Sequence, residues 1–234
     1  MSTVLNTIAG FFFTYTCPFC DSFDYDFENE ALCSKCSEKL HLIKAPYCKG
    51  CGAELDGVLE LCSKCLNSDV RPWCDAVSVF HMRGLGSDLI HQFKYNGSFE
   101  FGRSLGCVAT DAVLMRNLRF EVIVPIPLHW WRTVQRGFNQ SELIAEQLSV
   151  RLKIPMEKLL QRNRHTKQQA KLDKNEREKN LMNAFSTIAG ANYKKRSILL
   201  VDDVMTTGAT LTEATNELLK EVATEVNILV LARR

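Results

Sequence analysis

The stretch ILLVDDVMTTGATL, residues 198–211, decides the fold of this chain. It begins with a continuous apolar run, which is typical of a strand buried on both faces of a parallel sheet. Two adjacent carboxylates, Asp202 and Asp203, follow this run and lead into a segment rich in Thr and Gly. Apolar residues then recur at helical spacing, at Leu211, Ala214, Leu218 and Val222. The stretch therefore predicts a strand, a polar loop and an amphipathic helix in direct succession.

This loop has the composition of a site for a phosphorylated sugar. In an open parallel sheet, ligands bind outside the carboxyl ends of the strands, where loop N–H groups and a helix N-terminus form an anion nest. A glycine lets the backbone approach a phosphate, and threonine hydroxyls can donate to it. The two carboxylates suit vicinal ribose hydroxyls or the water ligands of Mg²⁺. We assign to this site Asp202, Asp203, Thr206, Thr207, Gly208, Ala209 and Thr210.

Two other interpretations of the same stretch are weaker. Two acids after a strand often only begin a turn, but the full pattern of apolar strand, paired acids and Thr-Gly loop is too specific for that. The chain has no G-x-x-x-x-G-K-[ST] pattern, so the motif of a P-loop nucleoside triphosphatase is excluded.

Strands and helices alternate through the rest of the chain from residue 71 onward. The pattern predicts strands at 74–82, 121–127, 196–204 and 225–232, and helices at 87–97, 103–118 and 139–152. Strand–helix–strand succession at this spacing predicts an α/β fold with a doubly wound parallel sheet and right-handed crossovers. We expect this domain to span 71–234 and a separate small module to span 1–70.

The N-terminal module is defined by cysteines. Eight of the ten cysteines form four C-x-x-C pairs, and we assign as metal ligands Cys17, Cys20, Cys33, Cys36, Cys48, Cys51, Cys62 and Cys65. Two pairs supply the four corners of a tetrahedron, so the pattern predicts two structural zinc sites. Disulfides are the weaker interpretation because no signal peptide precedes the pairs.

The spacing of the pairs does not decide how they combine. Sequential combination of neighbouring pairs is the simplest arrangement, and crossed combination stays open. The two cysteines outside the pairs, Cys74 and Cys107, are expected to be small buried apolar residues.

Composition and hydropathy exclude several classes of protein. A hydrophobic fraction of 46% supports a core, and a net charge of +2 by itself favours neither acidic nor basic partners. No segment approaches the roughly 18 apolar residues of a membrane span. The apolar start of the chain lacks the basic region and cleavage site of a signal peptide. We therefore expect a cytoplasmic protein with no membrane insertion.

The 198–211 stretch resembles the phosphoribosyl pyrophosphate (PRPP) fingerprint of type I phosphoribosyltransferases. Three further segments narrow this resemblance: LIHQFKY (89–95), VPIPLHWWRTVQRGFNQSELIA (124–145) and RNRHTKQQAKLDKNEREKNLMNAF (162–185). Together with the four C-x-x-C pairs, they are similar to the ComF/GntX family, of the competence-protein ComFC type. The similarity spans nearly the whole chain.

The resemblance carries expectations for the site. It implies that Asp202 and Asp203 hold the ribose hydroxyls of PRPP, with Mg²⁺, and that 206–210 holds its 5′-phosphate. The turn after the 122–127 strand would be the pyrophosphate loop, and 162–185 would be a flap over the site. The family also implies a double zinc ribbon, single-stranded DNA as a partner, and DNA-uptake helicase or recombination-loading proteins as further candidate partners.

Basic residues around this site have both a functional and a plain interpretation. Arg132 and Arg136 follow a strand end, where they suit bidentate phosphate contacts, or they are solvated surface residues. Lys94 ends a predicted helix and faces either the ligand or the solvent. The stretch 161–180 has seven Lys or Arg and three Asp or Glu, so it is a solvated face, a flap over a polyanion or a track for nucleic-acid phosphates. To such a track we assign Arg162, Arg164, Lys167 and Lys171.

Two functions from different classes fit these observations. The first is a PRPP-binding, phosphoribosyltransferase-like competence protein that handles single-stranded DNA during natural transformation. The second is an active phosphoribosyltransferase on an unidentified acceptor. A transferase needs a hood that reads the acceptor base, and here the zinc module and the 74–105 region must roof the site. No base-reading group of residues is evident there, so the sequence favours the first function.

Overall fold

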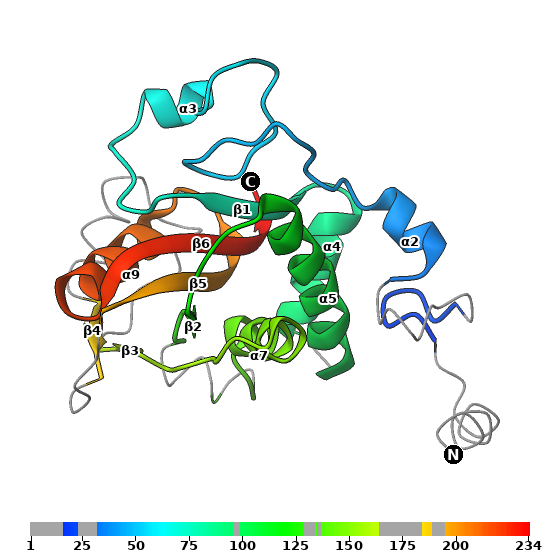
Figure 1. The fold of residues 1–234 in the computed structure, drawn as a ribbon. Helices are drawn as coiled ribbons and strands as arrows, with labels where there is room; N and C mark the ends of the chain where they lie inside the picture. Colours follow the sequence, from blue (N-terminus) through cyan, green and yellow to red (C-terminus); the bar gives the residue numbers. More distant parts are fainter. Residues whose placement is uncertain are drawn as a thin grey trace.

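The computed structural model describes residues 16–22, 32–95, 99–128, 134, 137–163, 184–188 and 195–234. Figure 1 shows how the elements in these ranges are arranged. In chain order they are α2 (Ser34–Lys39), α3 (Ser63–Leu66), β1 (Ala76–His81), α4 (Leu85–Tyr95), α5 (Phe99–Arg116), β2 (Val122–Pro125), α7 (Gln140–Leu152), β3 (Leu160–Arg162), β4 (Phe185–Thr187), β5 (Arg196–Met205), α9 (Ala209–Glu221) and β6 (Ala223–Arg233).

Four strands form a parallel sheet in the order β1-β6-β5-β2. Leu200 on β5 pairs with Val124 of β2 on one side and with Ile228 of β6 on the other. The four consecutive residues 198–201 have no exposed surface. This is the burial on both faces that a continuous apolar run predicts.

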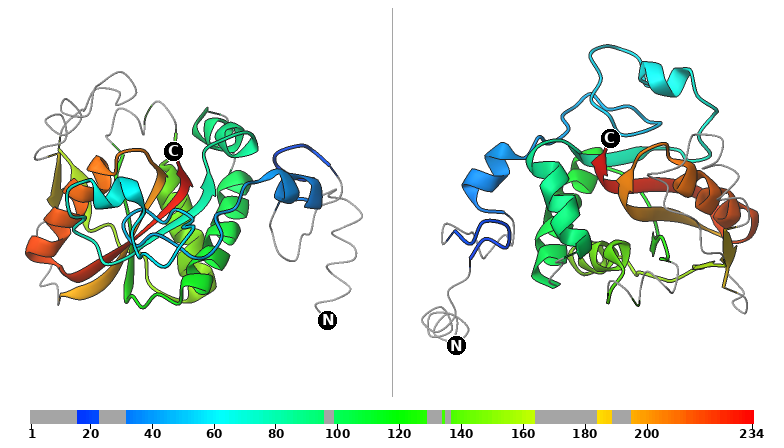
Figure 2. Two further views of the ribbon diagram at one scale, coloured as in Figure 1. Left: turned by 90° about the horizontal axis from the view of Figure 1, so that it is seen from above. Right: turned by 180° about the vertical axis from the view of Figure 1, so that it is seen from behind.

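Helices cover both faces of this sheet. Ile198 and Leu200 share one buried cluster with Leu211 and Leu218 of α9. Residues 199 and 201 point to the other face, where they share a cluster with apolar residues of α5 and α7. In the view from above, Figure 2 shows α9 and the α5–α7 pair on opposite sides of the sheet. The predicted doubly wound α/β fold is confirmed.

Helices α5 and α7 approach each other closely at two glycines of α5. A Cβ at Gly106 would lie 2.4 Å from the Cβ of Gln147, and one at Gly102 would lie 2.9 Å from the Cβ of Leu143. Any side chain at these positions would push α7 away. The glycines therefore allow α7 to pack where its N-terminus meets the end of β5.

The predicted flap is anchored by a small antiparallel ribbon. Leu160 of β3 pairs with Thr187 of β4, and Arg162 pairs with Phe185. The ribbon brings the two ends of the 162–185 segment together. The interior of that segment lies outside the described residues.

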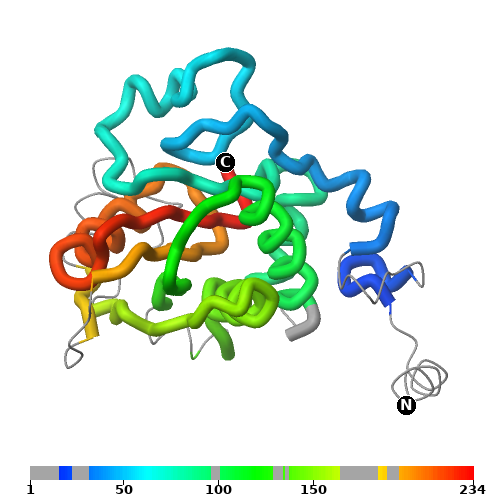
Figure 3. The backbone as a smooth tube through the Cα atoms, in the orientation of Figure 1, coloured from blue at the N-terminus to red at the C-terminus, as the bar shows by residue number. Residues whose placement is uncertain are grey.

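The cysteine-rich module lies against β1, the edge strand of the sheet. Leu42 forms an antiparallel bridge with Phe80, and the Ile43 N–H donates to the carbonyl of Val79. The Ser78 hydroxyl donates to the carbonyl oxygen of Cys51 at 2.9 Å. Figure 3 shows this part of the backbone running beside β1. Among the described helices, none combines the length and apolar character needed to cross a membrane.

Candidate functional site

The predicted sugar-phosphate residues converge at the carboxyl end of β5. Asp202 and Asp203 lie near the end of the strand, and α9 begins at Ala209 after a short loop. Asp202 and residues 204–211 line a small, open depression at this edge of the sheet. The structure therefore brings together the two carboxylates and the Thr-Gly loop, as the sequence predicted.

Asp202 is held by two donors. The Ser141 hydroxyl donates to Asp202 Oδ1 at 3.1 Å, and the Asp203 backbone N–H donates to the same oxygen at 2.9 Å. Ser141 itself is positioned by Asn139, the N-cap of α7, whose Oδ1 accepts from the Ser141 N–H. The Asn139 amide in turn donates to the carbonyl of Ile126, just past β2, at 3.0 Å. This chain of contacts ties β2, α7 and β5 together at the site.

The two carboxylates have different electrostatic surroundings. Burial and, after it, the negative charge of Asp203 raise the pKa of Asp202 to about 7, although the Asp203 N–H, Lys94 and Ser141 act to lower it. Asp203 forms an ion pair with Lys94 Nζ at 2.9 Å, and its side chain is 14% exposed. The predicted residue Lys94 therefore reaches the carboxylates from the last turn of α4.

The backbone conformation at Gly208 requires glycine. Its φ of +83° is a left-handed conformation that residues with a Cβ rarely adopt. A Cβ at Gly208 would lie 2.8 Å from Nη1 of Arg71 and 3.4 Å from Cη2 of Trp73. The left-handed backbone is therefore the reason why this position needs glycine, and two side chains from the segment between the module and β1 lie against it.

Three residues at this site were missed by the sequence reasoning. Arg71 and Trp73 belong to the segment that joins the cysteine-rich module to β1, and Ser141 belongs to the first turn of α7. Each reaches the site only through the tertiary fold. For Ser141 alone a local signal exists, because Asn139 two residues earlier predicts a helix start at the sheet edge.

The remaining predicted ligands of phosphate are not placed. Arg132, Arg136, Arg164, Lys167 and Lys171 lie outside the described residues. Arg162 is described and belongs to β3, where its guanidinium lies 5.3 Å from the centre of the Phe185 ring. Arg162 therefore has a packing role at the base of the predicted flap.

Two four-cysteine clusters lie in the module. They are formed by Cys17, Cys20, Cys33 and Cys36, and by Cys48, Cys51, Cys62 and Cys65. Within each cluster the sulfur atoms lie within 4.8 Å of one another, and a close pair in each is separated by 3.6 Å. Tetrahedral zinc with Zn–S bonds of about 2.3 Å places its sulfurs about 3.8 Å apart. The donor sets fit structural zinc, and the C-x-x-C pairs combine sequentially.

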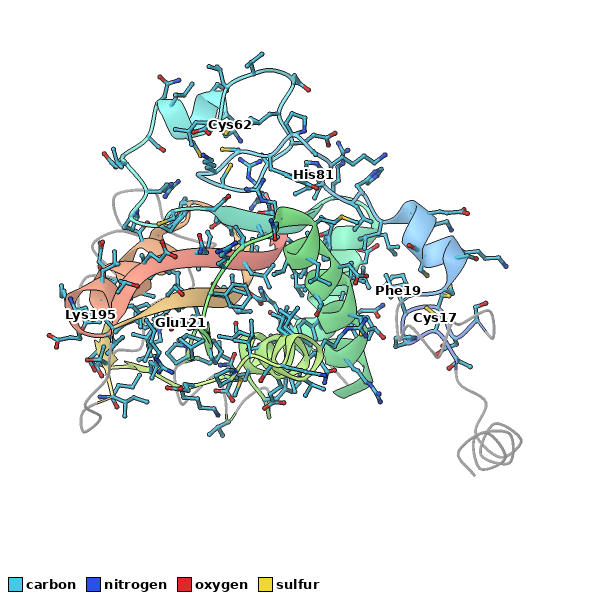
Figure 4. The ribbon with its side chains drawn as sticks, viewed as in Figure 1. Cys17, Phe19, Cys62, His81, Glu121 and Lys195 are labelled. Carbon is cyan, nitrogen blue, oxygen red and sulfur yellow. The ribbon has the colours of Figure 1, made fainter. Side chains whose placement is uncertain are left out.

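The clusters are supported separately. Cys17 and Cys62, labelled in Figure 4, lie in different parts of the module. The first cluster adjoins Phe19, whose ring lies 6.4 Å from that of Phe101 on α5. In the second, the Cys62 N–H donates to the Cys48 sulfur at 3.2 Å and the indole N–H of Trp73 donates to the carbonyl of Gly50 at 3.1 Å.

The expectation for the two remaining cysteines is half wrong. Cys107 is buried on α5, as predicted, but Cys74 is exposed. Cys74 precedes the first residue of β1, so the helix layers that bury the strand do not cover it.

Comparisons with known proteins agree with this architecture. The family model described as "Double zinc ribbon domain" matches residues 8–66, and the one described as "Phosphoribosyl transferase domain" matches 139–234. The chain is 35% identical to competence protein F of Haemophilus influenzae, over 95% of this chain and 98% of that protein. It is 33% identical to the DNA utilization protein YhgH of Escherichia coli, over 86% and 90%. With competence protein ComFC of Bacillus subtilis the identity is 28%, over 82% and 80%.

Fold, clusters and family matches together define a phosphoribosyltransferase-type domain that follows a double zinc ribbon. The similarity over nearly the full length of competence protein F identifies a particular family within this class. The chain belongs to the family of competence protein F and ComFC. The boundary near residue 70 between the module and the domain stays a prediction.

We predict two equivalents of zinc per chain, one in each cluster. Replacing Cys48 with Ser should lower the zinc content to one equivalent and unfold the module more than the 120–234 body, because a small module cannot bury a core of its own. Cys74→Ser, at an exposed cysteine outside both clusters, is the matched control and should keep both equivalents. Elemental analysis measures the metal. A zinc-free wild-type protein, or disulfides found by mass spectrometry, contradicts the prediction.

The raised pKa of Asp202 predicts a pH-dependent stability. The folded protein binds this proton up to a pH of about 7, whereas the unfolded chain releases it near pH 3.8. The resulting stabilisation is present below pH 3.8 and is lost as the pH rises to about 7. Asp202→Asn should therefore gain stability relative to wild type between pH 5 and pH 8.

Urea unfolding at both pH values tests this, with Asp56→Asn on the exposed surface as control. Equal shifts in both variants would argue against a protonated Asp202.

Proposed function

We propose that this protein binds PRPP together with Mg²⁺ through its phosphoribosyltransferase-type domain and handles single-stranded DNA in the cytoplasm during natural transformation. One observation carries the ligand assignment: two carboxylates stand beside a Thr-Gly loop at a helix N-terminus. An anion nest and a pair of oxygen acceptors, side by side, match the phosphate and the diol of a phosphoribosyl group.

The surroundings of the carboxylates support a ligand with hydroxyls or a bound cation. Asp203 and Lys94 already form an ion pair at 2.9 Å, so a divalent cation at these oxygens would compete with the Lys94 ammonium. Mg²⁺ prefers carboxylate oxygens and the phosphates of its substrate, and both would be supplied here. Bound between Asp203 and the ligand, Mg²⁺ would neutralise the negative charge that PRPP brings to a carboxylate edge.

The DNA-handling part of the proposal is supported by different observations. Relatives that match most of the chain are named competence proteins and DNA utilization proteins. The 161–180 segment has seven Lys or Arg against three Asp or Glu. Such a segment can follow a phosphate backbone without reading its sequence.

Phosphoribosyl transfer is a second candidate function. The pKa of Asp202, raised to about 7, favours it because a carboxylate with such a pKa can accept a proton near neutrality. An acceptor nitrogen would bond to C1 of the ribose as the bond to pyrophosphate breaks. Pyrophosphate would leave with the electron pair, and the nitrogen would lose its proton to the base. Pyrophosphate release with a panel of bases, lost in Asp202→Asn, tests this function.

PRPP affinity is the first quantity to measure. Asp203→Ala removes an acceptor for the ribose hydroxyls or for Mg²⁺, and we predict a loss of about 1.5–3 kcal/mol, the scale of a charged hydrogen bond. Titration calorimetry with PRPP and Mg²⁺ measures it. Asp88→Ala, at an exposed carboxylate on α4, should bind as the wild type does. Unchanged affinity in the Asp202→Ala, Asp203→Ala double variant would refute the site.

The second quantity is the salt dependence of DNA binding. We predict that replacing Arg164, Lys167 and Lys171 with Gln weakens binding to single-stranded DNA and flattens its log–log salt slope by roughly 0.7 per lost phosphate contact. Arg162 stays unchanged because it packs over Phe185. Fluorescence anisotropy at several salt concentrations measures the slope.

The control for this variant carries the same loss of charge elsewhere. Gln replaces the exposed lysines Lys35, Lys64 and Lys220, which lie in the module and on α9. If the two triple variants have the same slope, the segment does not contact DNA and the transferase function becomes the better one.

A further inference from the structure

Two side chains connect the second cysteine cluster to the loop of the sugar-phosphate site. Trp73 is buried, and its indole N–H donates to the carbonyl of Gly50, within the Cys48–Cys51 turn. The Arg71 guanidinium lies over the Trp73 ring, with its carbon 5.3 Å from the ring centre. Both side chains then reach Gly208, where a Cβ would lie 2.8 Å from Arg71 Nη1.

No acidic side chain in the described part of the chain balances the charge of Arg71. Its Nε is buried and has no hydrogen-bond acceptor among the described residues. No carboxylate of the described chain forms an ion pair with it, and its recorded partner is the face of Trp73. Arg71 as a whole is only partly buried. Its guanidinium stays charged at any pH at which the protein is folded, and burying the Nε–H without an acceptor is costly.

The place of this charge in the fold is equally unfavourable. Arg71 lies against Gly208, the N-cap of α9, so a cation stands at the positive end of a 13-residue helix. Cations destabilise helix N-termini, whereas anions stabilise them. An anion at the loop would balance the helix end and the guanidinium at once. It would also supply acceptors for the N–H groups of both.

We propose that Arg71 is a direct ligand of the anion at the 206–210 loop, which is the 5′-phosphate of the phosphoribosyl ligand, and that Trp73 is its positioning residue. The identity of the ligand rests on the proposed function; the need for an anion rests on the geometry alone. The segment that joins the zinc ribbon to β1 thus contributes a binding residue to the site, and the ribbon supports it through the hydrogen bond from Trp73 to Gly50. A planar guanidinium whose position over an indole is fixed is preorganised for two parallel hydrogen bonds to a phosphate.

Calorimetry with ribose 5-phosphate and with inorganic phosphate tests this assignment. Arg71→Gln should weaken the binding of both probes by about 10- to 100-fold, the range of a lost charged hydrogen bond. Arg71→Lys should recover part of the loss. Lys64→Gln removes a cation from an exposed position of the same module and should bind both probes like the wild type. Zinc content is measured in each variant to confirm that the ribbon is intact.

Asp203→Ala separates this proposal from the proposed function. It should weaken the binding of PRPP and ribose 5-phosphate but should not weaken the binding of inorganic phosphate, because it removes a negative charge and releases Lys94 without removing any donor. If Arg71→Gln binds inorganic phosphate as tightly as the wild type, the assignment of Arg71 is wrong, whatever Asp203→Ala does. If wild type binds phosphate through Arg71 but does not bind PRPP, the anion ligand stands and the proposed function fails. If wild type binds none of the probes, both are overturned.

A double-mutant cycle tests the role of Trp73. Trp73→Phe keeps an aromatic ring under Arg71 but loses the hydrogen bond to Gly50. It should weaken phosphate binding in the wild-type background and have no further effect in the Arg71→Gln background. Equal effects in both backgrounds would show that Trp73 acts on folding alone and would overturn its positioning role.

Discussion

A parallel sheet buried on both faces has room for charge only at the ends of its strands, and this constraint organises the whole molecule. Residues 198–201 of β5 and 228–231 of β6 are entirely buried. A carboxylate in the middle of either strand would lose its hydration without gaining a partner. The two acids therefore follow the last fully buried residue of β5. There the N-terminus of α7 and the end of α4 supply donors to them.

Side chains that are distant in the sequence lie together at this same edge of the sheet. Lys94 arrives from α4, Ser141 from α7 and Arg71 from the end of the zinc module. None of these contacts is local, so the site exists only when the sheet, both helix layers and the module are assembled. The zinc clusters are structural, yet the second of them supports Trp73 directly through Gly50. The segment that leaves the ribbon therefore reaches the same loop of the phosphoribosyltransferase-type domain that follows the two carboxylates.

The sequence predicted the parts of the fold and of the site that have a local signature. Apolar runs identified β2, β5 and β6, and the C-x-x-C spacing identified all eight ligands of the two clusters. Asp202, Asp203 and the loop after them were recognisable because one short string contains them all. Arg71 was not recognisable, because an arginine beside a proline carries no local sign of a binding role. Only the fold shows that it lies against Gly208. The exposure of Cys74 was wrongly predicted because burial depends on where the helix layers end, which residue type alone does not reveal.

The strand order also determines the sequence of events while the chain is being made. β6 follows the other described strands in the chain but lies between β1 and β5 in the sheet. Ala76 of β1 can therefore pair with Ile228 only after β6 has been synthesised. The nascent β1, with four apolar residues among its six, would meanwhile offer two unpaired edges to other chains. The zinc module precedes β1 and already bonds to it, through Leu42 and Ile43. Once loaded with metal, the module can cover one edge of β1 long before the sheet closes. Zinc supply during translation would then govern how much of the newly made protein aggregates.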